Sequence, residues 1–308
     1  MGFQEMHKIT DNDYITFLKS NQEVVIEDQH IVIGKEIIIK DLEPDNFKLE
    51  IENIWSFPDR GKWASHYLNA KYRGNYAPQV PRNIILRYSS ENDIVLDPFI
   101  GSGTTLIESK LLNRHGIGID INTGSAMIAM DRLHFNSGSD NFTDQEIYTG
   151  DARNMDKVSD GFVDLVITHP PYANIISYSK NNKIAGDLSG ISSIDEYYNE
   201  MRTVASEIFR VLKDGKYCAV LIGDSRKYKH QIPLSFRIMD IFLEQGFILK
   251  EDIIKIQHNT RTRQYWEKAS IEKNFLLLAY EHLFVFRKPD NRSTGMYKYS
   301  MKKFNNLL

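Results

Sequence analysis

One stretch of the sequence, residues 93–105, constrains the fold more than any other. It opens with the short apolar run 94–96, which is typical of a strand buried on both faces. Gly101 and Gly103 follow, and glycine allows the backbone to turn tightly against a ligand. Residues 106–112 then repeat apolar side chains at helical spacing. The pattern predicts a strand, a glycine turn and a helix.

The residues around this turn favour a cationic nucleoside without phosphate as the ligand. A glycine turn and a helix N-terminus could hold a phosphate, but the dinucleotide fingerprint needs a third glycine where this chain has Leu106. Asp97 stands at the carboxyl end of the strand, where α/β sheets bind their ligands. A carboxylate repels phosphate and accepts hydrogen bonds from hydroxyl or ammonium groups.

This stretch resembles the S-adenosylmethionine motif of the DNA amino-methyltransferases, the family that methylates adenine N6 or cytosine N4. The matching residues are Asp97, Pro98, Phe99, Gly101, Gly103, Thr104 and Thr105. The resemblance implies that S-adenosylmethionine is the cofactor and that these residues bind it. Because strand and helix patterns alternate along the chain, we expect an α/β, Rossmann-like class I methyltransferase fold, with a mostly parallel sheet and helices on both faces.

Two later strand patterns also end in acids. The pattern over 116–121 ends at Asp120 and Ile121, and Asp151 and Ala152 follow a third strand. An acid about 20 residues past a glycine turn is placed to accept from both ribose hydroxyls, which is the role expected of Asp120. By resemblance, Asp151 accepts from the adenine amino group of the cofactor. The alternative for Asp120 is an acid that only caps the next helix, and the alternative for Asp151 is an acid in a solvated loop.

A segment before the glycine turn completes the predicted cofactor site. In the resembled family a Gln-Lys-Pro segment followed by a helix helps to hold the methionine end of the cofactor. Gln79 begins a similar segment here, although Val80 replaces the lysine. Pro81 is well placed to open a helix over 82–89.

The fourth strand pattern, 162–168, leads into the predicted catalytic loop. This loop consists of His169, Pro170, Pro171 and Tyr172. Two prolines stiffen a loop and remove N–H donors, so that its carbonyls are available to accept. The resembled family has Asp, Asn or Ser before Pro-Pro-Tyr, where that side chain and the first proline carbonyl hold the target amine while the ring stacks on the base. A neutral His169 can also accept a hydrogen bond. An isolated Pro-Pro-Tyr is more typical of a plain loop or a proline-rich ligand. Its position 72 residues after Asp97 (169 minus 97), behind another apolar strand, favours the catalytic role instead.

Three regions are expected along the chain: a small β-rich extension (1–60), the methyltransferase domain (61–290) and a basic C-terminal tail (291–308). Short β-branched runs in the first region predict a small antiparallel meander, and they lie at 24–26, 31–33 and 37–39. The order of the motifs, cofactor before catalytic, resembles the gamma-type arrangement of the family.

Target recognition is expected from residues 173–190 and 223–270. Arginine reads guanine edges and phosphates, and glutamine reads adenine. The predicted DNA-binding residues are Arg226, Lys227, Lys229, Arg261, Arg263 and Gln264. A basic loop is expected over 223–230, and a solvated loop is the alternative for the segment 258–266. The basic and aromatic stretch 55–77 suits either a nucleic-acid surface or core packing.

Composition bounds the remaining possibilities. The chain has 308 residues, of which 42% are hydrophobic, so it can bury one substantial core. Its net charge of −3 does not point to nucleic acid, but a binding face needs only local positive charge.

No apolar run approaches the length of a membrane span, and no signal peptide is evident, so a cytoplasmic location without membrane contact is expected. The lone Cys218 lies in an apolar strand, where a core role is expected rather than that of a carbon-5 cytosine nucleophile. No metal site is predicted.

The sequence therefore predicts a site-specific DNA methyltransferase that acts on an exocyclic amine of a flipped base in double-stranded DNA. Because position 169 lacks Asp or Asn, cytosine N4 is slightly favoured over adenine N6. The alternatives are a tRNA guanosine N2-methyltransferase and a non-catalytic cofactor-binding DNA module of a larger complex. A cognate restriction enzyme is a further partner that the resemblance implies, and the oligomeric state is left open.

Overall fold

The computed structural model describes residues 3–26, 29–64, 72, 74–136, 142–172, 184–258, 263–291 and 300. The strands in these residues are β1 (His7–Lys8), β2 (Glu23–Ile26), β3 (Gln29–Val32), β4 (Ile54–Ser56), β5 (Ile94–Asp97), β6 (His115–Asp120), β7 (Gln145–Thr149), β8 (Val163–Thr168), β9 (Leu212–Ile222), β10 (Ser225–Lys227), β11 (His230–Ile232), β12 (Ile248–Ile256) and β13 (Tyr280–Arg287). The helices are α1 (Asp11–Leu18), α3 (Gln79–Tyr88), α4 (Thr104–Leu111), α5 (Thr123–Leu133), α6 (Ile194–Val211), α7 (Leu234–Glu244) and α8 (Arg263–Glu272), with a 3-10 turn η1 (Leu188–Gly190).

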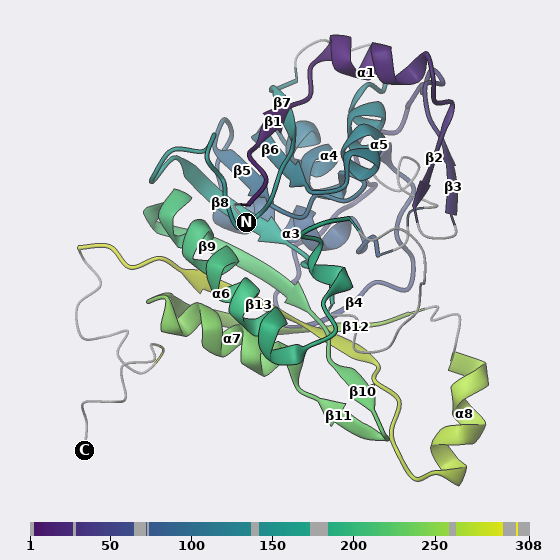
Figure 1. The fold of residues 1–308 in the computed structure, drawn as a ribbon, viewed down its shortest axis with the longest axis vertical. Helices are drawn as coiled ribbons and strands as arrows, with labels where there is room; N and C mark the ends of the chain where they lie inside the picture. The colour runs from purple at the N-terminus through teal and green to yellow at the C-terminus, as the bar shows by residue number, and fades with distance from the viewer. Residues whose placement is uncertain are drawn as a thin grey trace.

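A single large sheet organises the molecule (Figure 1). Within the described residues its strand order is β1-β7-β6-β5-β8-β9-β13-β12-β4. Strands β5 to β9 run parallel to one another, whereas β1 is antiparallel to β7 and β13 is antiparallel to both β9 and β12. The chain moves from β5 outward to β7, then returns to the other side of β5 as β8. The switch point between β5 and β8 is where open α/β sheets bind ligands. The predicted Rossmann-like, mostly parallel α/β fold is confirmed.

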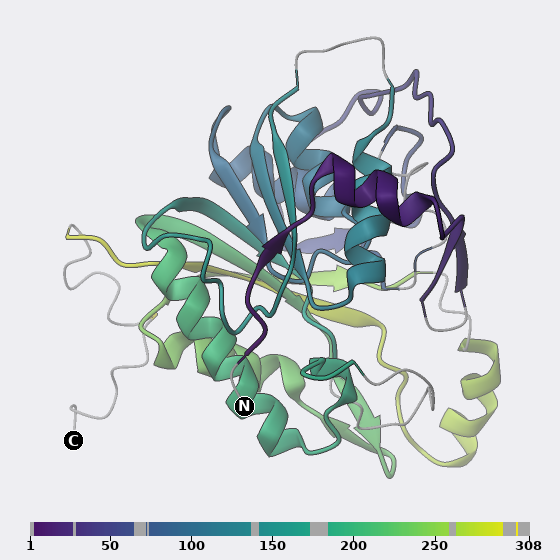
Figure 2. The same ribbon diagram turned by 45° about the horizontal axis from the view of Figure 1, so that its top comes forward.

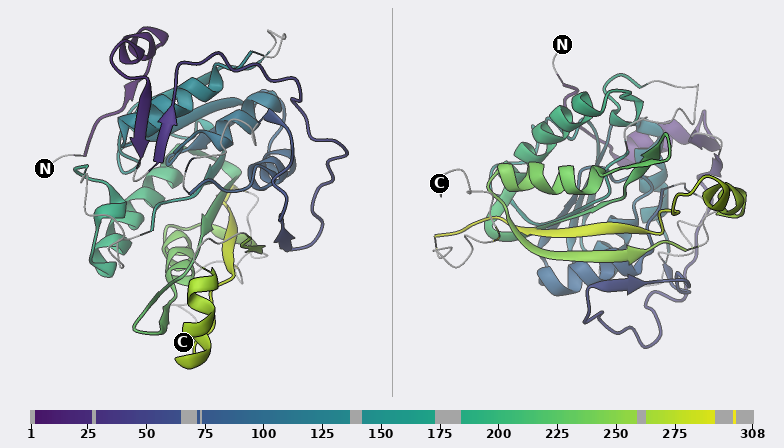
Figure 3. Two further views of the ribbon diagram at one scale, coloured as in Figure 1. Left: turned by 90° about the vertical axis from the view of Figure 1, so that its right-hand side faces the viewer. Right: turned by 90° about the horizontal axis from the view of Figure 1, so that it is seen from below.

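Helices cover both faces of this sheet (Figures 1 and 3). Helices α3, α4 and α5 pack side by side over one face, and α6 and α7 pack together over the other. Neighbouring residues of β5 face opposite layers, because Val95 joins the core under α3 while Leu96 joins the core under α6 and α7. Burial on both faces explains why β5 reads as an apolar run and why Asp164 is the one charged residue in β8. Cys218 of β9 is fully buried, which confirms its predicted core role.

The N-terminal region differs from the predicted meander. Strands β2 and β3 form the expected antiparallel hairpin, but the third run, 37–39, forms no strand and makes one isolated bridge from Ile38 to Asn136. Helix α1 was not anticipated, although Thr10 and Asp13 form a capping box that starts it. It lies across α5 (Figure 2). Strand β1 pairs with β7 and β4 pairs with β12, so this region supplies both edge strands of the large sheet.

Three other segments depart from the sequence-based expectations. Helix α3 begins at Gln79 rather than residue 82, because the first turn of a helix has no intrahelical acceptors for its N–H groups and so tolerates Pro81. The basic loop expected after β9 is the β10–β11 hairpin. Its two turn residues, Tyr228 and Lys229, have φ of 50° and 67°, values usually supplied by Asn or Gly. Helix α8 occupies a segment expected to be irregular.

Membrane insertion of a helix finds no support in the described part of the chain, since none of its helices combines the length and apolar character that a membrane span needs.

Candidate active site

The glycine turn connects β5 to α4 as expected. Gly101 and Gly103 have φ of 53° and 89°, the left-handed region that side chains rarely adopt. A Cβ at Gly103 would lie only 3.2 Å from the Cβ of Ala129 on α5. Glycine at this position therefore provides both the turn and the close approach of α4 to α5.

Asp97 holds the turn and the predicted catalytic loop together. Its carboxylate is buried and accepts from the Thr105 hydroxyl at 2.5 Å and from the Phe99 amide at 3.1 Å. It also accepts from the hydroxyl of Thr168, the last residue of β8, at 3.0 Å. Burial raises the pKa of Asp97 to about 6. Since Thr168 directly precedes His169, one carboxylate joins both motifs at the switch point of the sheet.

Asp120 lies at the carboxyl end of the neighbouring strand, β6. Its two oxygens accept from the backbone amides of Gly101, at 3.0 Å, and Asn122, at 2.8 Å. Burial raises the pKa of Asp120 to about 7. Each carboxylate oxygen can accept more than one hydrogen bond, so these contacts leave capacity for ligand hydroxyls.

Asp151 is engaged by a neighbouring cation. Arg153 donates to both of its carboxylate oxygens, from Nε at 2.8 Å and from Nη2 at 2.5 Å. Nη2 also donates to the Gly186 carbonyl at 2.6 Å. A Cβ at Gly186 would lie 3.1 Å from Ile121, so Ile121 and Asp151 sit under the same segment. A ligand amino group at Asp151 would share the carboxylate with Arg153. Ala152, beside it, is buried in the core.

Two predicted cofactor residues carry buried polar atoms without a partner. Among the described side chains, Gln79 Oε1 and Thr104 Oγ1 are buried and make no hydrogen bond. Such atoms are costly unless a ligand or water satisfies them. The amide nitrogen of Gln79 donates to the Asp59 carbonyl at 2.8 Å. Of the remaining predicted residues, Pro98 is buried beneath the turn and Phe99 is half-buried against the core.

The predicted catalytic loop follows β8. His169 and Tyr172 meet edge to face, with ring centroids 5.7 Å apart and His169 Nε2 lying 3.2 Å from the Tyr172 hydroxyl. Burial lowers the pKa of His169, which favours the neutral imidazole. Pro170 is buried, and the Pro171 carbonyl accepts from the Tyr197 hydroxyl of α6 at 2.9 Å, which anchors the loop.

Three residues around this loop were not predicted as catalytic or cofactor-binding residues. Glu281 and Lys255 form an ion pair beside Tyr172, and the ring of Tyr76 lies 6.0 Å from that of His169. The hydroxyl of Tyr76 is hydrogen bonded to Thr105, so this ring bridges the two motifs. Because β13 runs antiparallel to β9, the first residues of β13 lie at the edge where the parallel strands end. Strand direction is a tertiary property, and no local signal marked Glu281.

The predicted DNA-contacting residues lie on two elements that extend from this same edge, because the β10–β11 hairpin follows the carboxyl end of β9 and α8 lies between the end of β12 and the start of β13. Arg226 and Lys227 are on β10, Lys229 is in the hairpin turn and Gln264 is exposed on α8. The Arg226 guanidinium donates to the Lys229 carbonyl at 2.6 Å and lies over the Phe275 ring, so the hairpin and the segment after α8 are neighbours. Both project from the body of the molecule (Figures 1 and 3). Arg263 begins α8, whereas Arg261 lies outside the described residues, as do 173–183 of the first recognition segment and nearly all of the tail beyond 291.

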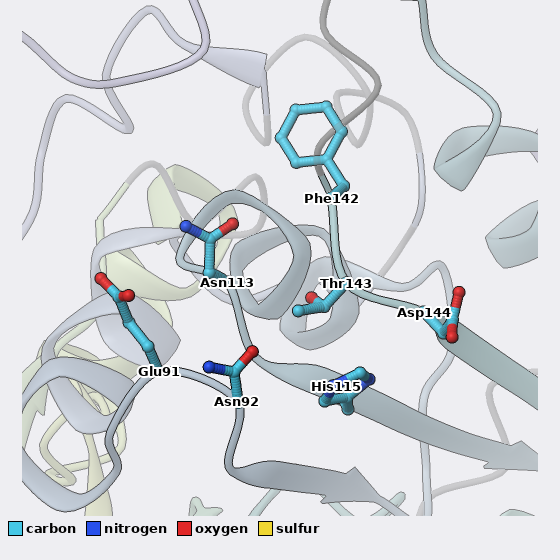
Figure 4. Close-up of a pocket in the computed structure, with 7 residues that line it drawn as sticks. All are labelled: Glu91, Asn92, Asn113, His115, Phe142, Thr143 and Asp144. Atoms are coloured by element: carbon cyan, nitrogen blue, oxygen red, sulfur yellow. The ribbon is translucent and has the colours of Figure 1, made fainter.

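A separate polar recess of about 350 Å³ lies at the opposite edge of the sheet (Figure 4). Its lining residues come from the loops that precede β5, β6 and β7 and from the first residue of β6, namely Glu91, Asn92, Asn113, His115, Phe142, Thr143 and Asp144. Because parallel α/β sheets bind ligands at the carboxyl ends of their strands, this recess is not the candidate site.

The fold and the two joined motifs define a Rossmann-like protein with a ligand-binding edge. The family model described as DNA methylase (N6_N4_Mtase) matches residues 6–131 and 163–307, which is most of the chain. The chain therefore belongs to the DNA methylase family.

Individual relatives match shorter parts of the chain. The Type II methyltransferase M.HpaI of Haemophilus parainfluenzae is 46% identical over 85 residues, which are 26% of this chain and 25% of that protein. The Type II methyltransferase M.MthZI of Methanothermobacter thermautotrophicus is 25% identical over 164 residues, 49% of this chain and 46% of that protein. The chain thus spans less than half the length of each of these relatives. A solved S-adenosylmethionine-dependent methyltransferase from Methanosarcina mazei is 17% identical with a TM-score of 0.46, over 67% of this chain and 97% of that one.

Proposed function

We propose that this protein transfers a methyl group from S-adenosylmethionine to an exocyclic amine of a base flipped out of double-stranded DNA. The observation that carries the proposal is the hydrogen bond from Thr168 to Asp97, 3.0 Å long, which joins the glycine turn to the His-Pro-Pro-Tyr loop across neighbouring strands. A donor bound at the turn and an amine bound at the loop would meet at the switch point. Membership of the DNA methylase family supports the same substrate.

The residues of the glycine turn and its neighbours suit this cofactor. Asp120 would accept from the ribose hydroxyls, and the partnerless oxygens of Gln79 and Thr104 offer further polar contacts. Asp151 and Ile121 would lie at the adenine end. When bound, S-adenosylmethionine supplies an electrophilic methyl group on a cationic sulfur.

The loop residues would activate the amine. Its nitrogen lone pair is conjugated into the base, so the free amine is a weak nucleophile. Acceptors at Pro170 and at a neutral His169 would draw its N–H bonds toward tetrahedral geometry, and the ring of Tyr172 would stack on the base. Alignment of the amine with the methyl group supplies much of the acceleration. In this proposal His169 would also take up the proton that the amine releases.

The proposed target base rests on the residue at position 169. Because His169 stands where the resembled family has Asp, Asn or Ser, we favour cytosine N4 slightly over adenine N6. The test is mass spectrometry of nucleosides after incubation of DNA with protein and isotope-labelled cofactor. Label in N4-methylcytosine or N6-methyladenine supports the proposal and identifies the base. A parallel assay uses total tRNA as the substrate. If neither methylated DNA base carries label but guanosine of the tRNA does, the DNA proposal is replaced by the tRNA guanosine reaction.

Partners are proposed on the same basis. The relatives named above are Type II methyltransferases, and an orphan methyltransferase, M.BamHII of Bacillus amyloliquefaciens, is 37% identical over 82 residues, 26% of this chain and 31% of that protein. We propose double-stranded DNA as the substrate and a cognate restriction enzyme as the partner. Sequencing of modified bases in a methylation-free host that expresses this chain would reveal the recognition site that such an enzyme must share.

Replacing Asp120 with alanine should weaken cofactor binding by about 1.5–3 kcal/mol, the usual contribution of hydrogen bonds to a charged acceptor. Isothermal titration calorimetry measures this directly. The pKa of about 7 also predicts that wild-type affinity increases as the pH rises through 7, because only the ionised carboxylate is a strong acceptor. An Asp120→Asn protein should lack this pH dependence.

Asp144→Ala provides the control, since Asp144 is an exposed acid at the opposite edge of the sheet. Its cofactor affinity should equal that of the wild type. Unchanged affinity in Asp120→Ala would move the cofactor away from this strand end.

A further inference from the structure

Glu281, at the start of β13, is a buried acid in contact with the predicted catalytic loop. Only 5% of the residue is exposed. Its Oε1 accepts from the Tyr172 hydroxyl at 3.0 Å and lies 3.9 Å from His169 Nε2, while its Oε2 accepts from Lys255 Nζ at 2.7 Å. Its carboxylate therefore connects the catalytic loop to the β12–β13 hairpin.

Lys255 keeps this carboxylate ionised. Burial by itself would favour the protonated acid, but the neighbouring ammonium holds the pKa of Glu281 below its usual range. A buried ion pair contributes little net stability compared with apolar side chains of similar size. An ionised acceptor does make a stronger and more directional hydrogen bond than a neutral one. The Glu281–Lys255 ion pair is therefore better suited to orienting the group that donates a hydrogen bond to Glu281 than to stabilising the fold.

The group that donates to Glu281 is the Tyr172 hydroxyl, which contacts three residues. It accepts from the Gly223 amide at 3.0 Å, donates to Glu281 and faces His169 Nε2 at 3.2 Å. A Cβ at Gly223 would lie 2.9 Å from the Tyr172 hydroxyl oxygen and 3.2 Å from Cγ of Glu281. The end of β9 therefore leaves room for this contact only because residue 223 is glycine.

We propose that Glu281 is a positioning residue, which fixes the ring of Tyr172 through its hydroxyl while Lys255 supplies the compensating charge. The inference rests on the proposed function, because the ring so fixed is the one expected to stack on the flipped base. It assigns a role to the tyrosine hydroxyl that a phenylalanine at position 172 could not fill.

A double-mutant cycle tests this assignment. Tyr172→Phe and Glu281→Leu should each lower kcat for DNA methylation by about 10-fold, the effect of losing one hydrogen bond to a charged group, with KM for the cofactor unchanged. Because both changes remove the same contact, the double variant should be no slower than either single one. If the fold-losses in kcat of the two single variants multiply in the double variant, Glu281 acts on kcat by a route other than the Tyr172 hydroxyl. Wild-type kcat in either single variant would also overturn the proposal.

Rescue and control variants separate positioning from folding. Glu281→Gln keeps an acceptor for the hydroxyl but leaves Lys255 unpaired, so adding Lys255→Met should restore kcat toward the wild type. The matched control is Asp252→Asn, which removes the acid of the Asp252–His282 pair, 2.9 Å apart, on the other face of the same hairpin. It should leave kcat unchanged, and thermal unfolding of every variant should confirm that it is folded.

A measurement without substrate keeps this inference distinct from the proposed function. In NMR of protein with ¹³C-labelled tyrosine, the Tyr172 ring signals are identified by their loss in Tyr172→Phe. They should shift and broaden in Glu281→Leu but not in Asp252→Asn. Unchanged ring signals in Glu281→Leu would reject the positioning role, even in an active enzyme. A wild-type protein that methylates no nucleic acid, but shows the expected ring changes, would instead reject the proposed function.

Discussion

Substitution of Tyr172 by alanine is expected to lower the rate of methyl transfer by about 100-fold or more, while cofactor affinity stays close to that of the wild type. The variant loses the ring that would stack on the base and also the hydroxyl that contacts Gly223 and Glu281. Misplacement of a reacting group by about 1 Å can by itself cost about 100-fold. Single-turnover assays with labelled cofactor measure the rate, and calorimetry measures the affinity.

The control for this prediction is Tyr88→Ala. Tyr88 is a half-buried tyrosine at the end of α3, where it packs against Tyr217 with ring centroids 4.7 Å apart. Loss of this ring removes a comparable aromatic contact outside the candidate site, so the rate should be retained. If Tyr172→Ala also retained the rate, the base would have to stack elsewhere.

Replacement of Glu108 by alanine should lower the free energy of unfolding by about 3–5 kcal/mol, the usual cost of breaking a buried ion pair from one side. Glu108 of α4 is fully buried and accepts from Trp63 Nε1 at 2.6 Å and from Arg82 Nη1 at 2.9 Å. The side chain of Arg82 is only 5% exposed. The variant would leave this guanidinium and the indole N–H buried with fewer partners. Urea unfolding followed by circular dichroism measures the loss.

An exposed ion pair provides the comparison. Glu272 of α8 lies 3.6 Å from Lys268, and its side chain is 55% exposed. Pairs of this kind contribute about 0–1 kcal/mol, so Glu272→Ala should be close to neutral. A loss below about 1 kcal/mol in Glu108→Ala would mean that water or a rearranged side chain satisfies Arg82.

The central strands and the loops that follow them could be read from the sequence because their signals are local. Strands buried on both faces require uninterrupted apolar runs, and β5, β6 and β8 were predicted to within a residue or two. The glycine turn was equally clear, since its left-handed φ values leave little choice of residue. The hairpin turn at Tyr228 and Lys229 was missed for the opposite reason, because neither residue type signals such a conformation.

Tertiary structure decided which side chains share the candidate site. The sequence identified His169 and Tyr172 through their motif and placed Asp97 and Asp120 at strand ends. It could not show that Thr168 ties the two motifs through Asp97, or that Asp151 is already paired with Arg153.

The sequence by itself thus determined the order of strands, acids and motifs along the chain, and with it the family. The structure alone decided that Glu281 and Lys255 reach the catalytic loop, because this depends on β13 running against its neighbours. Short-range patterns report how a segment packs its own side chains. The direction and neighbours of a strand are fixed by contacts between residues far apart in the chain, and no local pattern records them.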